Sequence, residues 1–267
     1  MTLLNYQFKF NSLTIGQSTP YIVTNVDGLG GISPLRIQDD NRGYIDGSYS
    51  GRDFYDERQV DIDVTIVGDN TYSAQYYYNE FQKAFAPQPV GYYPDPTGTT
   101  PASQQLKLFQ FRLTGTTGDM RMYGRVRALE TPITPEFTYG YIQTRVRLTF
   151  PDPRYYDDTG TITSGTSMTV ANLGWAISCP VITVANITST SGSITDGTTT
   201  MSFANLTLTS ALRVDLLQRV IYEDLVPTRN LMTAASGGWL DIPPNTTSLT
   251  WTSTIGTMST NYRNAYV

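Results

Sequence analysis

The sequence of 267 residues predicts a mainly β protein with two domains and one substantial helix. Three patterns lead to this prediction. Apolar and polar residues alternate in several short segments, as they do in half-buried strands. One stretch alone, near residues 71–86, has apolar residues at helical spacing. After residue 150 the composition changes, because charged side chains become rare and Ser and Thr become abundant.

The clearest strand of the first half lies at residues 60–66. There Val60, Ile62 and Val64 alternate with polar neighbours, and Asp61 and Asp63 are expected on the opposite face. Further strands are predicted at residues 6–10, 20–26, 106–113, 120–129 and 139–150, with a turn at 27–31 and an extended, proline-rich loop at 87–101. These segments predict a set of antiparallel strands.

The helix follows the strand at 60–66. Ala74, Tyr78, Phe81 and Phe85 are separated by four, three and four residues, which places them on one helical stripe. Asn70 or Thr71 is expected to cap its start, and Pro87 to stop it. The sequence therefore predicts one helix near 71–86 that packs one face on the strands.

The second half has a different amino-acid composition. Residues 159–212 hold 22 Ser or Thr in 54 positions, and Asp196 is their one charged residue. Thr suits pleated strands, so short strands are predicted at 177–184, 201–208, 212–216, 220–222, 239–242 and 248–251. The predicted boundaries are a first domain at 1–150, a connector at 151–158 and a second domain at 159–267. Within the connector, Asp152, Pro153 and Arg154 are expected to form a stiff link.

The composition excludes several function classes. The chain has no His and one Cys, so it has neither a Ser-His-Asp triad nor a four-ligand His/Cys zinc site. We predict no catalytic, cofactor-binding or metal-binding residues and no cofactor. With a net charge of −5, the chain lacks the basic footprint that nucleic acid requires. It also lacks a secretory leader and a long apolar run, so no membrane insertion is expected.

Four kinds of residue are candidates for function. Asp61 and Asp63 share a strand face, so a carboxylate-only glycosidase is one hypothesis, although an ordinary exposed face explains them better. Tyr76 and Tyr77 lie on the helix and are candidates for a partner surface, because Tyr suits interfaces. Trp239 and Trp251 are expected in a sandwich core, with a sugar-binding platform as the alternative. Cys179 is expected to be a buried small apolar residue.

The order of short segments resembles that of the distal tail protein family of long-tailed phages and related tail-like particles. The segments are residues 21–29, 43–51, 55–58, 60–68 with the helix that follows, 152–156, 212–220, 230, 239–243 and 245. The last turn departs from the family pattern, because Pro243, Pro244 and Asn245 stand where the family has Pro-Gly-Asn.

The resemblance implies a structural protein of the virion tail, made and assembled in the host cytoplasm. It implies an N-terminal β-sandwich domain that forms a ring, commonly a homo-hexamer, and a C-terminal galectin-like β-sandwich. Its implied partners are further copies of itself, the tail tube protein, and the tail fibre, tip or receptor-binding proteins. The galectin sugar site uses a His, which this chain lacks. A carbohydrate-binding or host-recognition module of a virion is the alternative hypothesis.

Overall fold

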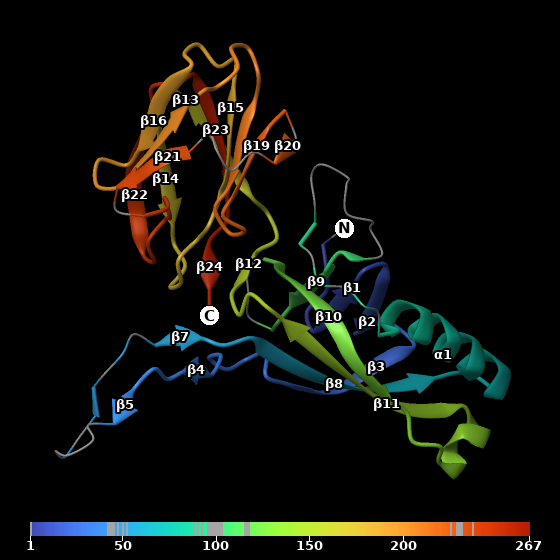
Figure 1. Cartoon of the computed structure of the whole chain (residues 1–267). Helices are drawn as coiled ribbons and strands as arrows, with labels where there is room; N and C mark the ends of the chain where they lie inside the picture. Colours follow the sequence, from blue (N-terminus) through green and yellow to red (C-terminus); the bar gives the residue numbers. More distant parts are fainter. Residues whose placement is uncertain are drawn as a thin grey trace. The chain divides into compact units, whose positions relative to one another are not determined.

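The computed structural model describes residues 2–41, 46, 48–49, 51, 53–87, 89, 91, 93–94, 104–114, 118–224, 226–227, 232–236 and 238–267. The prediction of a mainly β protein is confirmed (Figure 1). The chain forms two compact units. The first holds residues 1–92, 101–155 and 267, and the second holds 93–100 and 156–266. Most of the predicted loop at 87–101 and, among the family-like positions, residues 43–45, 47, 50 and 230 lie outside the described residues.

One curled antiparallel sheet builds the first unit. Its strands follow the order β2 (Leu13–Gly16), β1 (Gln7–Phe10), β9 (Lys107–Arg112), β10 (Met120–Glu130), β11 (Tyr141–Phe150), β8 (Arg58–Val67) and β3 (Tyr21–Asp27). The strand β10 joins the two halves of this sheet. Its residues 120–124 pair with β9, and its residues 125–130 pair with β11. The end strands β2 and β3 also approach each other. The two halves therefore enclose one core.

The alternation of apolar and polar residues at 60–66 corresponds to a strand, β8, with one buried face, as predicted. Val60, Ile62 and Val64 are buried, while Asp61 and Asp63 lie on the outer face of the sheet. The strand is central rather than at an edge, because β11 and β3 pair with its two sides. The strand predicted at 6–10 begins one residue later, at Gln7, so Tyr6 lies outside it. Tyr6 precedes β1 with a positive φ of 60°, and its side chain is exposed.

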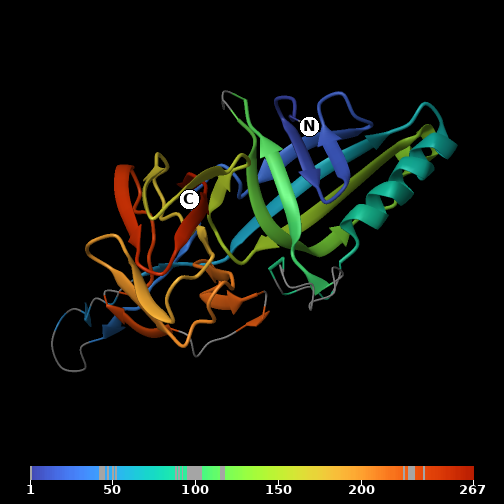
Figure 2. The ribbon, with the colours of Figure 1, turned by 90° about the horizontal axis from the view of Figure 1, so that it is seen from above.

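The predicted helix is confirmed as α1 (Thr71–Phe85), shown beside the strands of its own unit in Figure 2. Asn70 caps it by accepting a hydrogen bond from the Ser73 backbone, and the Ser73 hydroxyl reaches back to complete a capping box. Phe85 stacks on Phe10 of the sheet at 5.2 Å between ring centroids. Phe81 in turn stacks on Phe85 at 4.5 Å. The helix thus contributes its apolar stripe to the core of the first unit.

Between β3 and β8 the chain forms a segment that we call the arm, with the short strands β4 (Leu35–Arg36), β5 (Asp40–Asn41), β6 (Ser48–Tyr49) and β7 (Phe54–Tyr55). Two antiparallel ladders, β4 with β7 and β5 with β6, join its two sides. In Figure 1 the arm extends away from the sheet of the first unit. The arm is therefore a two-stranded ribbon outside the core.

The second unit is a sandwich of two antiparallel sheets. One has the order β13 (Thr161–Gly165), β23 (Thr257–Tyr262), β15 (Val181–Ala185), β18 (Leu212–Asp215), β19 (Val220–Glu223) and β20 (Val226–Pro227). The other has the order β14 (Ser167–Asn172), β22 (Thr246–Ser253), β16 (Ser191–Thr195), β17 (Thr200–Ala204) and β21 (Met232–Ser236). Side chains from both sheets share one core, in which Trp251 is fully buried. Two short strands, β12 (Tyr155–Asp157) and β24 (Ala265–Tyr266), pair with each other.

Three strand predictions in this unit were wrong in whole or in part. The strand predicted at 201–208 ends at Ala204, because Asn205 has a positive φ of 59°. Residues 239–242 form no strand, and Ile242 makes a single bridge to Ser178. The strand predicted from Ile177 begins only at Val181, after Pro180, whose missing N–H interrupts a ladder. Six strands of its two sheets were not predicted. One is β20, which has only two residues, and the other five are β13, β14, β16, β21 and β23. These strands contain many Ser, Thr or Ala residues, so their apolar alternation is weak.

Candidate functional site

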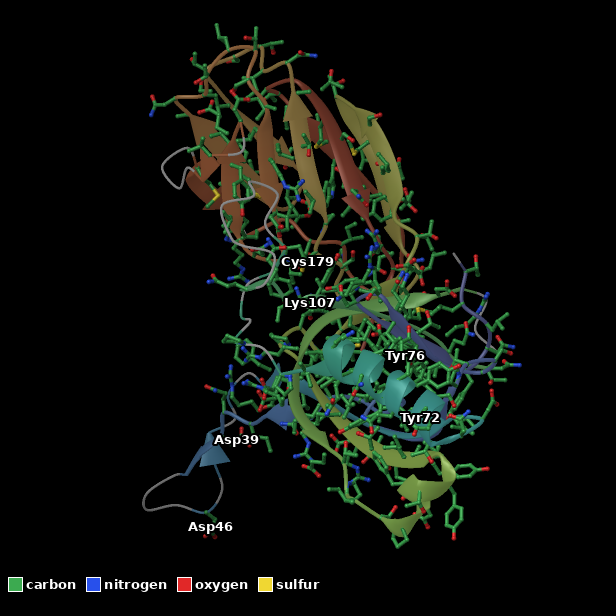
Figure 3. All side chains as sticks on the ribbon, turned by 90° about the vertical axis from the view of Figure 1, so that its right-hand side faces the viewer. Asp39, Asp46, Tyr72, Tyr76, Lys107 and Cys179 are labelled. Atoms are coloured by element: carbon green, nitrogen blue, oxygen red, sulfur yellow. The ribbon has the colours of Figure 1, made fainter. Side chains whose placement is uncertain are left out.

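The tyrosines of α1 differ in their surroundings. Tyr76 is exposed, and so is Tyr72 one turn earlier (Figure 3), where side chains four residues apart lie on one helical face. Tyr77 is half-buried, and its ring packs edge-on against Tyr21 at 6.1 Å. The ring of Tyr76 lies 5.8 Å from the ring of Tyr77, measured between centroids. The partner surface predicted at Tyr76 and Tyr77 stays a prediction, with Tyr72 as the exposed neighbour that sequence reasoning missed.

Tyr21 on β3 contacts the helix at Tyr77. Its hydroxyl donates a hydrogen bond to the Tyr77 carbonyl at 3.2 Å, and its side chain is buried. Burial, followed by the negative charge of Glu80, raises the pKa of Tyr21 to about 12. The folded protein therefore holds this proton more tightly than the unfolded chain does.

This difference predicts a loss of stability at high pH. The unfolded phenol ionises near its ordinary pKa of 10.0, and the folded one near 12. The contribution of Tyr21 is thus complete below pH 10 and lost as the pH rises through 12. Tyr21→Phe should flatten this part of the stability profile, measured by urea unfolding at stepwise higher pH. Tyr72→Phe, which removes an exposed phenol, is the control. Equal slopes for wild type and Tyr21→Phe would contradict the prediction.

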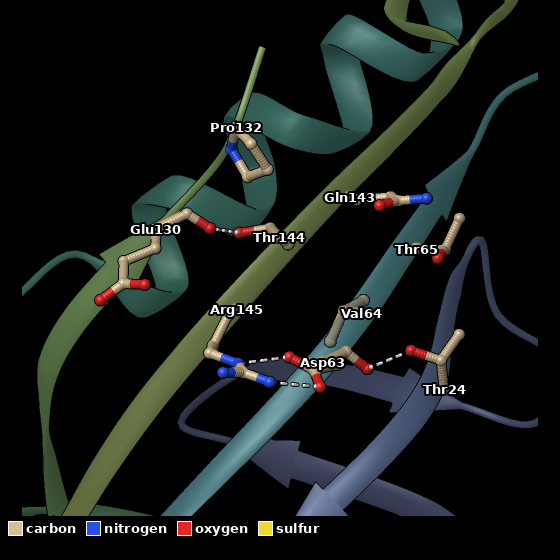
Figure 4. A pocket seen from close by; sticks show the side chains of 9 residues that line it. All are labelled: Thr24, Asp63, Val64, Thr65, Glu130, Pro132, Gln143, Thr144 and Arg145. Carbon is tan, nitrogen blue, oxygen red and sulfur yellow. Dashed lines mark hydrogen bonds and ion pairs between the residues drawn. The ribbon is translucent and has the colours of Figure 1, made fainter. Parts of the chain in front are cut away.

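The outer face of β3, β8 and β11 carries a groove of about 590 Å³ (Figure 4). Within it Asp63 accepts two hydrogen bonds from Arg145, at 2.6 Å to Oδ1 and 2.8 Å to Oδ2. Next to it on the same strand, Asp61 accepts two from Arg147 at 2.9 and 3.0 Å. The other groove-lining residues are Thr24, Val64, Thr65, Glu130, Pro132, Gln143 and Thr144.

These ion pairs weigh against the glycosidase hypothesis. A glycosidase needs a carboxyl group whose pKa is raised so that it can donate a proton. The hydrogen bond from Arg145 instead lowers the pKa of Asp63. Each carboxylate is also occupied by a guanidinium. The two ion pairs therefore form a cross-strand ladder of charges on the exposed face of the sheet, an arrangement that is unsuited to acid catalysis.

A buried arginine joins two segments of the first unit. The guanidinium of Arg58 donates to the carbonyls of Gly28 and Gly31 at the base of the arm, at 2.9 and 2.6 Å. Its Nε donates to the carbonyl of Pro153 at 2.9 Å. Beside Pro153, the Arg154 side chain donates to Asp152 at 2.7 Å. Asp152, Pro153 and Arg154 are thus held in place locally, and their role as a connector stays a prediction.

The remaining candidates lie in the second unit. Trp251 is fully buried, which confirms the core prediction for this residue and leaves it inaccessible to a sugar. For Trp239 the prediction holds in part, since Trp239 packs against the same core but is only half-buried. The prediction for Cys179 holds in part, since it packs on that core but is only half-buried. Within the described ranges, no group of three His, Cys, Asp or Glu side chains could hold a metal ion. Among the same residues, no helix is long and apolar enough to cross a membrane.

Sequence comparisons and structure comparisons give different results. No protein-family model matches the chain, and no curated protein matches it by sequence. Solved structures do match. The SPP1 Dit protein, described as a paradigm of the hub adsorption apparatus in phages that infect Gram-positive bacteria, gives a TM-score of 0.67 at 12% identity, covering 98% of this chain and 99% of that chain. Two structures of the phage P2 baseplate in its activated conformation, with Ca and with Sr, give TM-scores of 0.52 and 0.50 at 6% identity, each covering 97% of this chain and 98% of the matched one.

The chain therefore has a fold that also occurs in phage hub and baseplate proteins. In particular, it is similar in fold to SPP1 Dit along almost its whole length. The resemblance that the ordered segments predicted is confirmed at the level of the fold.

Proposed function

We propose that the chain is a distal tail protein, a structural component of a phage tail tip. It forms a ring that joins the tail tube to the baseplate, tail fibre or receptor-binding complex. Two independent observations support this proposal. The fold is similar to that of SPP1 Dit along 98% of the chain, and the ordered sequence segments resemble the distal tail family. The role is structural and requires no catalytic step or cofactor.

The structural feature that supports assembly into a ring is the arm. A two-stranded ribbon is marginally stable by itself in water. This ribbon nevertheless exposes large apolar side chains, with Ile32 and Ile37 exposed by 74% and 68% and Leu35 and Tyr55 by about half. Clustered exposed apolar residues are typical of surfaces that bind another protein. Contact with a neighbouring copy would bury them and repeat around a closed ring.

We propose that the two domains have different roles. The first, residues 1–150, forms the ring, which we expect to be a homo-hexamer. Residues 151–158, with Asp152, Pro153 and Arg154, connect it to the second domain at 159–267. That domain is a galectin-like sandwich which attaches the fibre, tip or receptor-binding proteins. A further contact with a partner, such as the tail tube protein, is formed by the exposed Tyr76 and Tyr72 together with the half-buried Tyr77.

The proposed place of the chain is the virion tail, after synthesis and assembly in the host cytoplasm. Native mass spectrometry and negative-stain microscopy of the purified protein test the proposal. We expect closed rings with six copies. A protein that stays strictly monomeric at micromolar concentration, and gives no ring in assembled particles, would contradict it. Saturable binding on a glycan array by such a monomer would instead favour the carbohydrate-binding alternative.

A further inference from the structure

The arm and the groove on the outer face of the sheet lie toward opposite ends of the strand β8. The arm ends where β8 begins, at Arg58, and the groove lies toward the other end, where Asp63 and Thr65 line it. With ten residues, β8 is roughly 33 Å long. In Figure 1 the arm extends away from the sheet, so the groove of the same copy stays open.

Exposed apolar side chains surround this groove. Ile22 lies opposite Thr65 in the strand register, and Ile133 follows Pro132 in the chain, while Thr65 and Pro132 both line the groove. The exposed apolar residues in and beside its rim are Ile133 (91%), Tyr139 (76%), Ile22 (48%) and Tyr141 (48%). Clustered exposed apolar residues of this kind are typical of surfaces that bind another protein.

The arm and the groove rim match in apolar character and in size. The arm exposes Ile32, Leu35, Ile37, Phe54 and Tyr55, and the rim exposes four large side chains to a similar degree. At about 150–250 Å² for each large side chain, the two surfaces together offer on the order of 1,000 Å². A specific interface between proteins needs at least about 1,000 Å². A contact between arm and groove would therefore be large enough.

One charge on each surface also fits the other. Arg36 is exposed on the arm, with its guanidinium carbon 5.8 Å from the centre of the Phe54 ring. Glu130 is exposed at the groove. Arg145 stands opposite Glu130 in the register, but its Nε and Nη2 donate to Asp63, as Figure 4 shows. Within the part of the chain that the structure describes, neither Arg36 nor Glu130 forms an ion pair.

We propose that the groove receives the arm of a neighbouring copy, with Arg36 of one copy facing Glu130 of the next. This inference rests on the proposed ring and names the two surfaces that form its contacts. A ring needs two different surfaces on each copy, since a surface that binds its own equivalent closes a dimer. The arm and the groove, toward opposite ends of β8, supply such a pair.

Two single variants and their mixture test this contact. Arg36→Glu places like charges at every contact between arm and groove, and so does Glu130→Arg. Each variant alone is expected to assemble at least about tenfold more weakly than the wild type, measured by native mass spectrometry over a dilution series. Mixing them in equal amounts restores opposite charges at every contact of an alternating ring with an even number of copies. The mixture should therefore form rings that contain equal numbers of both variants.

The matched control is Arg219→Glu, because Arg219 is exposed in the second unit and its charge changes as in Arg36→Glu. The control should assemble like the wild type, and all variants should keep the wild-type Tm. Wild-type assembly of both single variants, or no recovery in their mixture, would overturn the arm–groove contact while the proposed ring stands. A wild type that forms only dimers, weakened in both variants and regained in the mixture, would uphold the contact while contradicting the proposed function. The two failures are therefore distinguishable.

Discussion

Ile37→Asp is expected to leave the protein folded and to abolish its assembly into rings. Ile37 lies on the arm and is 68% exposed, so its replacement removes little from the core of the isolated chain. Exposed substitutions of this kind usually change the free energy of unfolding by less than about 0.5 kcal/mol. In a ring the same position would be buried against a neighbour. An unpaired carboxylate buried there would be strongly unfavourable at every interface around the ring.

The matched control for this experiment is Ile162→Asp. Ile162 lies on β13 in the second unit and is 66% exposed, so the two substitutions change the same side chain at nearly equal exposure. Native mass spectrometry should find the control as rings and Ile37→Asp as monomers, with similar melting curves for both. Rings formed equally well by Ile37→Asp would show that the arm is not the assembly surface. Loss of rings in both variants would point to a general effect of added negative charge.

The sequence was most informative where apolar side chains repeat with a regular period. Alternation places Val60, Ile62 and Val64 in the core, and the stripe from Ala74 to Phe85 gives the helix. The same alternation also contains a signal that was missed. Arg58 stands two residues before Val60 in the buried phase, so the period itself places this arginine toward the core.

Other features could not be predicted because their determinants are not local. The arm consists of two-residue strands, which are too short to show a period. The strands β13 and β16 are rich in Thr, Ser and Gly, so they show little apolar alternation, and β13 pairs with β23, which lies far away in the sequence. In contrast, Trp239 and Ile242 suggested a strand because they are apolar, yet they reach the core from an irregular segment. Tertiary packing overrides local propensity at such positions.

Arg58→Met is expected to be strongly destabilising, even though it replaces a buried charge by an apolar side chain of similar length. Such replacements are often neutral or stabilising when the partner charge is removed as well. Here the partners are backbone carbonyls of Gly28, Gly31 and Pro153, which cannot be removed. Each partly buried acceptor left without a donor costs about 1–3 kcal/mol, so the total loss should be about 3 kcal/mol or more.

Arg145→Met provides the control, because Arg145 also forms two hydrogen bonds but lies on the exposed face of the sheet. Exposed ion pairs contribute little to stability, so this variant should unfold close to the wild type. Urea unfolding gives the comparison. Limited proteolysis supplies a second readout, since loss of the Arg58 bonds should expose residues 28–34 and 151–158 together. If Arg58→Met and Arg145→Met had the same unfolding midpoint, Arg58 would not be the residue that holds the arm base and the segment around Pro153 in place.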